Sequence, residues 1–183
     1  MITTELMKKH TPKNITVGLY HDECPDCPTE FSDWKLVSFN QRHNSFGEIE
    51  DLEELKKRIK EGTAFSLSYF EHGQCSWSLS GEGSNCPWDS VSYAGVLYWE
   101  GEGKPEEEWA RGFLEEYTNW CNGNVYGYTI EDEDGEEVDS CWGFYDAEYM
   151  FAEIGHNIRS IDKVKFVGGA DFLSDYHQIE RTA

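Results

Sequence analysis

The chain has 183 residues, with 36 acidic against 15 basic side chains and a formal net charge of −21. This charge repels nucleic acid and anionic membranes at long range, which argues against a direct nucleic-acid or membrane-surface binder. Hydrophobic residues make up 38% of the chain and aromatic residues 15%, which excludes a disordered acidic tail and allows a buried core.

The amino-terminal residues and the cysteines predict the compartment. Residues 1–10, MITTELMKKH, lack the apolar segment of a signal peptide, and no apolar run approaches the length of a membrane span. We therefore expect a cytoplasmic protein whose polar residues 1–14 form a mobile lead-in. In that compartment the six cysteines, at positions 24, 27, 75, 86, 121 and 141, are expected to be reduced thiols rather than a disulfide framework.

The first part of the chain combines strand patterns with one amphipathic helix. Short apolar runs predict strands at residues 15–20 and 34–39, separated by an acidic loop that contains proline. Apolar side chains then recur at helical spacing and predict a helix over residues 48–61, which ends at Gly62. Its apolar stripe consists of Ile49, Leu52, Leu55 and Ile59.

The middle of the chain predicts three more strands and a second helix. Residues 64–69 and 75–79 are expected to form a hairpin, and residues 91–99 a further strand. A helix is expected over residues 105–121, because Pro105 suits a first helical turn and the acids after it complement the positive end of the helix dipole. These acids are Glu106, Glu107 and Glu108. The face expected to pack in the core is Trp109, Phe113, Tyr117 and Trp120.

Residues 125–142, VYGYTIEDEDGEEVDSCW, predict a β-hairpin with an acidic turn. Apolar and aromatic residues alternate on both sides of Asp134-Gly135, and both residue types tolerate the positive φ angles of hairpin turns. Mutual repulsion of the turn acids gives folding no obvious benefit, so the turn is either a binding element or a solvated tip. Seven of the nine residues from 131 to 139 are acidic: Glu131, Asp132, Glu133, Asp134, Glu136, Glu137 and Asp139.

The sequence argues against a calcium-binding loop at this turn. Asp132, Asp134 and Gly135 match positions three, five and six of an EF-hand loop. The first and twelfth positions would be Ile130 and Cys141. The loop therefore lacks both its first carboxylate and its final bidentate glutamate.

A third helix and a last strand complete the pattern. They are expected at residues 147–158 and 162–167. Strands and helices do not alternate strictly, and hairpins require antiparallel pairing. We therefore expect an α+β fold, a single domain over residues 1–183 with an antiparallel sheet built from hairpins and about three helices packed on one face. The residues of the third helix expected to face inward are Ala147, Phe151, Ile154 and Ile158.

One spacing in the chain is compatible with a metal site. His21, Cys24 and Cys27 have HxxCxxC spacing, and thiolate and imidazole are natural zinc ligands. The remaining ligand would have to be Cys75, Cys86 or His43. The favoured interpretation is a pair of reduced loop thiols without a metal. A redox role for CPDC is less favoured, because it does not open a helix in a βαβ unit.

No motif in the sequence indicates an enzyme or a cofactor. The chain contains no Gly-x-Ser-x-Gly elbow, His-Glu-x-x-His motif, P-loop or dinucleotide fingerprint. Spacing alone does not separate two glycosidase acids from its many other carboxylates. We therefore expect a non-enzymatic protein without cofactors.

The loop at residues 86–90, CPWDS, places a tryptophan among turn-forming residues. Pro87 restricts the entry to the loop, and Asp89 and Ser90 can hydrogen-bond nearby backbone groups. Trp88 is expected to fill the edge of the core. The alternative is that it contacts a partner.

Three stretches resemble a family of small acidic proteins from phages and mobile elements. Residues 22–44, DECPDCPTEFSDWKLVSFNQRHN, are similar to the front segment of the family, although members often lack the two cysteines. Residues 86–90 resemble its CPWDSG loop, with Val91 in place of glycine. Residues 125–145 resemble its VYGY, EDEDGE and DSCWGFYG block, with Asp146 in place of glycine. The resemblance implies a phage setting and carries no activity over.

Charge and this resemblance together predict an interaction protein. Small, very acidic phage proteins often occupy the nucleic-acid channel of host defence enzymes, as antirestriction and anti-CRISPR proteins do, and carboxylates on a rigid surface can mimic phosphates there. We expect an inhibitor that acts in the host cytoplasm on a basic, nucleic-acid-binding defence protein. The expected contacts are Trp88, the acids at 106–108 and the seven acids of the hairpin. The alternative is a zinc-stabilised or catalytic protein that uses His21, Cys24 and Cys27.

Overall fold

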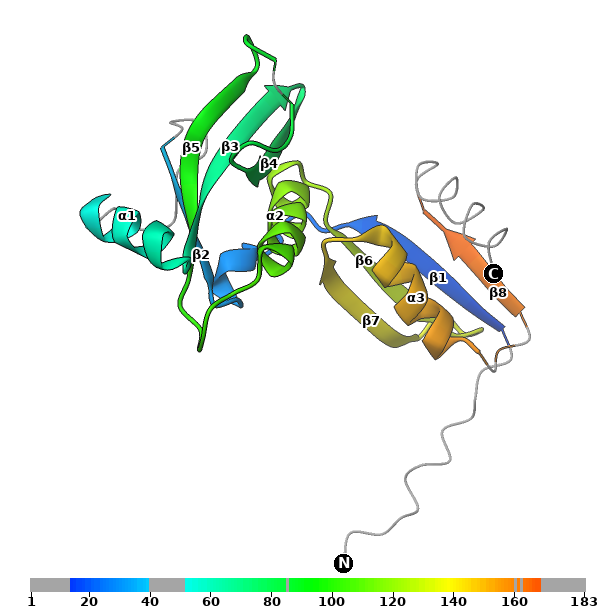
Figure 1. Ribbon diagram of the computed structural model, residues 1–183. Helices are drawn as coiled ribbons and strands as arrows, with labels where there is room; N and C mark the ends of the chain where they lie inside the picture. Colours follow the sequence, from blue (N-terminus) through cyan, green and yellow to red (C-terminus); the bar gives the residue numbers. More distant parts are fainter. Residues whose placement is uncertain (1–13, 40–51, 85, 160, 162, 169–183) are drawn as a thin grey trace, which may run out of the picture. The chain divides into compact units, whose positions relative to one another are not determined.

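The structure, a computed structural model, describes residues 14–39, 52–84, 86–159, 161 and 163–168. The chain divides into two compact units: unit 1 runs up to Pro25 and resumes at Val125, and unit 2 is Asp26–Asn124. The described residues form three α-helices, one short 3₁₀ helix and eight strands (Figure 1), which confirms the α+β class. Residues 1–13 of the expected lead-in and residues 48–51 of the first expected helix lie outside the described residues.

Unit 1 contains a four-stranded sheet in the order β7-β6-β1-β8. β1 pairs antiparallel with β6, and β6 with β7, so the hairpin predicted at residues 125–142 is confirmed. β8 runs parallel to β1, a departure from the expected antiparallel sheet, because α3 carries the chain from the β7 edge across to the opposite edge. The strands are β1 (Asn14–His21), β6 (Tyr126–Glu131), β7 (Glu137–Phe144) and β8 (Lys163–Val167).

Helix α3 (Ala147–Asn157) covers one face of this sheet (Figure 1). The Asp146 carboxylate caps its first turn by accepting a 2.7 Å hydrogen bond from the Glu148 amide. Alternate residues of β1 and β6 point toward the helix, as the period of a strand requires, and form one apolar core with it. The buried members are Ile15, Val17, Leu19, Tyr128, Ile130, Phe144, Met150, Phe151 and Ile154, and Ala147 and Ile158 pack against them.

Unit 2 contains a second sheet, antiparallel throughout, in the order β2-β5-β3-β4. Helices α1 and α2 lie on opposite faces of it (Figure 1). The strands of the chain therefore form two sheets, where hairpin patterns alone predicted one, and the second sheet is covered on both faces. The elements are η1 (Pro28–Glu30), β2 (Trp34–Ser38), α1 (Leu52–Glu61), β3 (Ala64–His72), β4 (Gln74–Leu79), β5 (Ser90–Trp99) and α2 (Glu107–Cys121).

The continuous apolar runs of β2 and β5 are explained by these two covered faces. Leu36 pairs with Leu97 in the register, and both belong to the larger apolar cluster, which includes the buried residues of α2. The neighbouring pair, Val37 and Val96, points to the other face and packs with Leu55 of α1. A strand that is buried on both faces needs apolar residues at consecutive positions rather than alternate ones.

The apolar face predicted for residues 105–121 is correct in part. Phe113 and Tyr117 are buried and Trp120 packs against the core, but Trp109 is 52% exposed. α2 begins at Glu107, so Trp109 lies in its first turn. Ala110, one position further along the helix, is fully buried in its place.

Strand β4 is an edge strand whose outer backbone groups are paired by side chains at the end of α2. The Asn122 side chain accepts a 2.8 Å hydrogen bond from the Cys75 amide and donates another of 2.8 Å to the Cys75 carbonyl. The Thr118 hydroxyl accepts a 3.0 Å hydrogen bond from the Trp77 amide. These side chains do what a neighbouring strand would do, so the edge carries paired rather than open backbone groups.

Replacing Asn122 with alanine is expected to lower the free energy of unfolding by about 2–3 kcal/mol, because two part-buried backbone groups of Cys75 lose their partners. Urea unfolding followed by tryptophan fluorescence measures the change. Asn124→Ala is the matched control, since the Asn124 side chain makes no hydrogen bond with the described residues. An equal loss in both variants would show that the Asn122 bonds contribute little.

Candidate functional site

The turn of the acidic hairpin is built by hydrogen bonds to Asp132. Its carboxylate oxygen Oδ1 accepts from the amides of Asp134, at 2.9 Å, and Glu136, at 3.0 Å. Its own amide donates to the Glu136 carbonyl at 3.0 Å. Gly135 has a positive φ of 80°, a conformation that suits glycine. The turn therefore lies where Asp134-Gly135 predicted it, and Asp132 is a structural residue rather than a free contact charge.

A second acid of the hairpin, Asp139, anchors strand β7 to helix α3. Its Oδ2 accepts hydrogen bonds from the Tyr128 hydroxyl, at 3.2 Å, and from Asn157 Nδ2, at 3.1 Å. Asn157 also donates to the Tyr128 hydroxyl at 3.0 Å. Burial, together with the nearby Asp139 charge, raises the pKa of Tyr128 to about 12. Tyr128 thus remains a neutral donor at physiological pH, and Asp139 is its acceptor.

The other five hairpin acids make no ion pair within the described residues. Glu133, Asp134, Glu136 and Glu137 are exposed, and Glu131 is partly buried. Their few contacts are with neutral groups: a Glu133 oxygen accepts from the Asn14 amide at 3.4 Å, and a Glu137 oxygen accepts from the Ser140 hydroxyl at 3.0 Å. A fixed turn therefore concentrates negative charge that no salt bridge neutralises.

The acids at the start of α2 are partly neutralised by a neighbouring arginine. They belong to unit 2, and two of them pair with Arg111: Glu107 at 2.8 Å and Glu108 at 3.7 Å. Arg111 also binds Glu82 at 2.8 Å. Of the three predicted contact acids, only Glu106 makes no ion pair among the described residues. These charges serve the packing of the helix start against the loop after β4, so they are weaker candidates than the hairpin.

Trp88 is 91% exposed, so the prediction that it fills the edge of the core is wrong. The side chain of Asp89 holds the loop instead, because its Oδ2 lies 3.3 Å from His72 Nδ1 and accepts a 3.4 Å hydrogen bond from the Cys86 thiol. Ser90 adds two bonds, from its amide to the Cys86 carbonyl and from its hydroxyl to the Ser84 carbonyl. The expected bond from Ser90 to nearby backbone is confirmed, whereas the Asp89 side chain bonds the side chains of His72 and Cys86 instead.

Two further apolar side chains close to Trp88 in the sequence are also exposed. Val91 is 48% and Tyr93 71% exposed. Tyr93 has a positive φ of 57°, which is unusual for an aromatic residue, and it lies where the pairing register between β3 and β5 shifts. Residues Trp88, Val91 and Tyr93 are called the aromatic loop surface below. Sequence reasoning missed Tyr93, because a bulge of this kind depends on the distant strand β3.

The zinc candidates do not form a cluster in the part of the chain that the structure describes. No three metal-ligating side chains converge there, and His43 lies outside the described residues. Cys24 is exposed, whereas Cys27 is buried, with its sulfur 3.1 Å from Thr29 Oγ1. The His21 ring packs against Tyr126, with 5.1 Å between the ring centroids. Among these residues the structure therefore shows packing and a local hydrogen bond.

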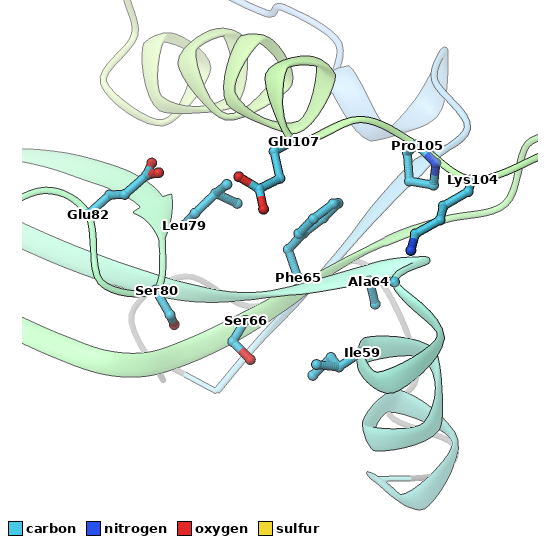
Figure 2. A pocket seen from close by; sticks show the side chains of 11 residues that line it. Ile59, Ala64, Phe65, Ser66, Leu79, Ser80, Glu82, Lys104, Pro105 and Glu107 are labelled. Carbon is cyan, nitrogen blue, oxygen red and sulfur yellow. The ribbon is translucent and has the colours of Figure 1, made fainter.

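Unit 2 also has an open cavity of ≈ 470 Å³ between the end of α1, β3 and the start of α2 (Figure 2). Phe65 and Leu79 form apolar parts of its wall, and Lys104 and Glu107 are at its rim (Figure 2). Its described lining contains serine hydroxyls but no histidine or cysteine. Both carboxylates of this lining, Glu82 and Glu107, are paired with Arg111.

No family model, curated protein or solved structure matches this chain. Within the described residues, no helix combines the length and the apolar character that a membrane crossing requires. Geometry and charge therefore give two separate candidate features: the five hairpin acids of unit 1, on a hairpin held by Asp132 and Asp139, and the aromatic loop surface of unit 2.

Asp139→Ala is expected to lower the free energy of unfolding by about 1–3 kcal/mol, because the buried Tyr128 hydroxyl loses its acceptor. Chemical denaturation of the purified protein measures this change in the free energy of unfolding. Glu137→Gln, two residues away on the same strand, removes the same charge without touching this network and is expected to remain within about 0.5 kcal/mol of wild type. Equal stability of the two variants would show that the hydrogen bonds of Asp139 do not stabilise the fold.

Trp88→Ala is expected to leave the melting temperature within the error of thermal unfolding, because the side chain is almost fully exposed. Trp34→Ala is the contrast, since Trp34 is 4% exposed and its loss is expected to cost about 3–5 kcal/mol. A large drop in melting temperature for Trp88→Ala would contradict the solvent-facing loop.

Proposed function

We propose that this chain is a non-enzymatic interaction protein whose acidic hairpin binds the basic groove of a nucleic-acid-binding protein. The observation that supports the proposal is the set of five acids on the β6–β7 turn, which is held in one conformation and has no salt-bridge partner among the described residues. The resemblance to acidic phage proteins suggests the class of target, a host defence enzyme that handles DNA or RNA in the cytoplasm.

The arrangement suits a basic groove for electrostatic reasons. A groove lined with lysine and arginine attracts anions over long distances, and clustered carboxylates speed the encounter. A carboxylate turn that is already ordered loses little conformational entropy when it binds, unlike an acidic tail. Because Asp132 and Asp139 fix the turn by hydrogen bonds to neutral groups, the remaining acids stay available for a partner.

The aromatic loop surface gives the proposal a second contact element. Tryptophan and tyrosine are enriched among the residues that dominate binding energy at protein interfaces, and a solvent-facing tryptophan is an unusual use of an apolar side chain. Charge would then supply the rate and salt dependence of binding, and Trp88 would supply affinity that salt does not weaken. No observation among the described residues favours the zinc-stabilised or catalytic alternative.

Neutralising the free acids tests the proposal while keeping the turn. The variant Glu133→Gln, Asp134→Asn, Glu136→Gln, Glu137→Gln retains Asp132, Gly135 and Asp139 and is expected to fold with equal or slightly higher stability. Its affinity for the partner at low salt should fall by about tenfold or more, and its salt dependence should flatten. The partner is first isolated by pull-down from nucleic-acid-depleted bacterial lysate, and binding is then titrated with the purified protein.

The matched control removes the same number of charges elsewhere. Glu100, Glu102, Glu115 and Glu153 are exposed and are replaced with glutamine. If both variants lose affinity equally, net charge rather than the hairpin drives binding, and if neither loses affinity, the hairpin is a solvated tip.

Added duplex DNA should displace the wild-type chain from the partner. Binding that DNA does not disturb would contradict occupation of a nucleic-acid groove.

A further inference from the structure

Two cysteine thiols meet in unit 2 where the edge strand β4 packs against the end of α2. Cys75 lies on β4 and is 7% exposed, and Cys121 is the last residue of α2 and is partly buried. Both belong to the apolar cluster of unit 2. Interaction between the two thiols shifts the pKa of both, downward for Cys75 and upward for Cys121.

The backbone around these thiols is fixed independently of the sulfur atoms. Asn122, the residue after Cys121, bonds both the amide and the carbonyl of Cys75 at 2.8 Å. One turn earlier on the helix, Thr118 bonds the amide of Trp77 at 3.0 Å. The helix end and the strand cannot slide past each other without breaking these bonds, so the two thiols are held as neighbours.

The surroundings of the two sulfur atoms differ. Interaction with Cys121 lowers the pKa of the Cys75 thiol. Interaction with Cys75, together with burial, raises the pKa of Cys121. A lower pKa favours the thiolate, which is the nucleophilic form of cysteine, so Cys75 is assigned the first step below.

We propose that Cys75 and Cys121 form a redox-active dithiol that a peroxide oxidises to a disulfide joining β4 to α2. The Cys75 thiolate attacks one peroxide oxygen and the O–O bond breaks. With hydrogen peroxide, this leaves Cys75 sulfenic acid, and the released hydroxide takes up a proton to give water. The Cys121 sulfur then attacks the sulfenic sulfur, the S–O bond breaks, and the hydroxyl leaves as water with the Cys121 proton. Two thiols and one peroxide thus become one disulfide and two water molecules.

This proposal stands apart from the binding role of the hairpin. A reducing cytoplasm keeps the pair as thiols, and a peroxide burst would close it. The disulfide would close the loop between residues 75 and 121 and reinforce the contact that Asn122 makes, so oxidised protein should be more stable than reduced protein.

Peptide mapping of the full-length chain tests the proposal directly. Fully reduced protein is treated with hydrogen peroxide at low protein concentration, alkylated, and digested without reductant. The expected result is a peptide pair linked through Cys75 and Cys121, formed at a rate independent of protein concentration, with a melting temperature several degrees higher that a phosphine reductant reverses. The exposed cysteines Cys24 and Cys141 are internal controls for peroxide exposure, since they should be oxidised as well.

Two variants separate the steps. In Cys121→Ser, dimedone should trap a sulfenic acid on Cys75, and the peroxide-induced rise in melting temperature should disappear. Cys27→Ser removes the other buried cysteine of the cluster and should leave the Cys75–Cys121 link intact. The proposal is overturned if wild-type protein keeps both thiols reduced while Cys24 reacts, or if Cys121 links to Cys27 instead.

Discussion

The acidic turn is crowded with like charges, and neutral hydrogen-bond donors rather than cations hold it. Two of the seven hairpin acids provide this. Asp132 accepts backbone amides inside the turn, and Asp139 accepts the Tyr128 hydroxyl and the Asn157 amide group. Their hydrogen bonds oppose the repulsion among the other acids, and the core residues of β6 and Phe144 of β7 hold the far end of the hairpin. The two acids that hold the hairpin therefore alternate in one segment with five acids that make no ion pair among the described residues. The number of charges in the segment does not show which acids belong to which group.

Local patterns predicted nearly every described helix and strand of this chain. The spacing of apolar residues and the residue types that form turns can both be read from neighbouring positions in the sequence. The alternation around Asp134-Gly135 and the apolar spacing of residues 147–158 are examples, and both elements lie where they were expected. The division of the strands into two sheets was not predictable in this way. It depends on β1 pairing with β6 and β2 with β5, across separations of about a hundred and of sixty residues. The parallel pairing of β8 is long-range for the same reason.

The candidate site was predictable as a segment but not residue by residue. Nothing adjacent to Asp139 indicates that Tyr128 and Asn157 will lie beside it, and nothing near Glu107 indicates that Arg111 is shared with Glu82, which lies 29 residues before that arginine. For Trp88, the sequence predicted a buried side chain, and the structure shows an exposed one. Tryptophans are usually buried at least in part, so the core was the natural expectation, but Asp89 and Ser90 satisfy the loop by themselves and leave the ring no core to enter.

The two proposals use different units, and the chain passes between those units directly after the dithiol. Cys121 ends the last helix of unit 2, and unit 1 resumes at Val125, where the strand leading to the acidic turn follows at once. Each unit has its own apolar core, so the hairpin does not need the β4–α2 contact in order to fold. Oxidation of the pair should therefore strengthen unit 2 while leaving the charge and hydrogen bonds of the turn unchanged. The backbone joins the two units at two places, Pro25–Asp26 and Asn124–Val125, and the second of these leads from the dithiol directly into β6.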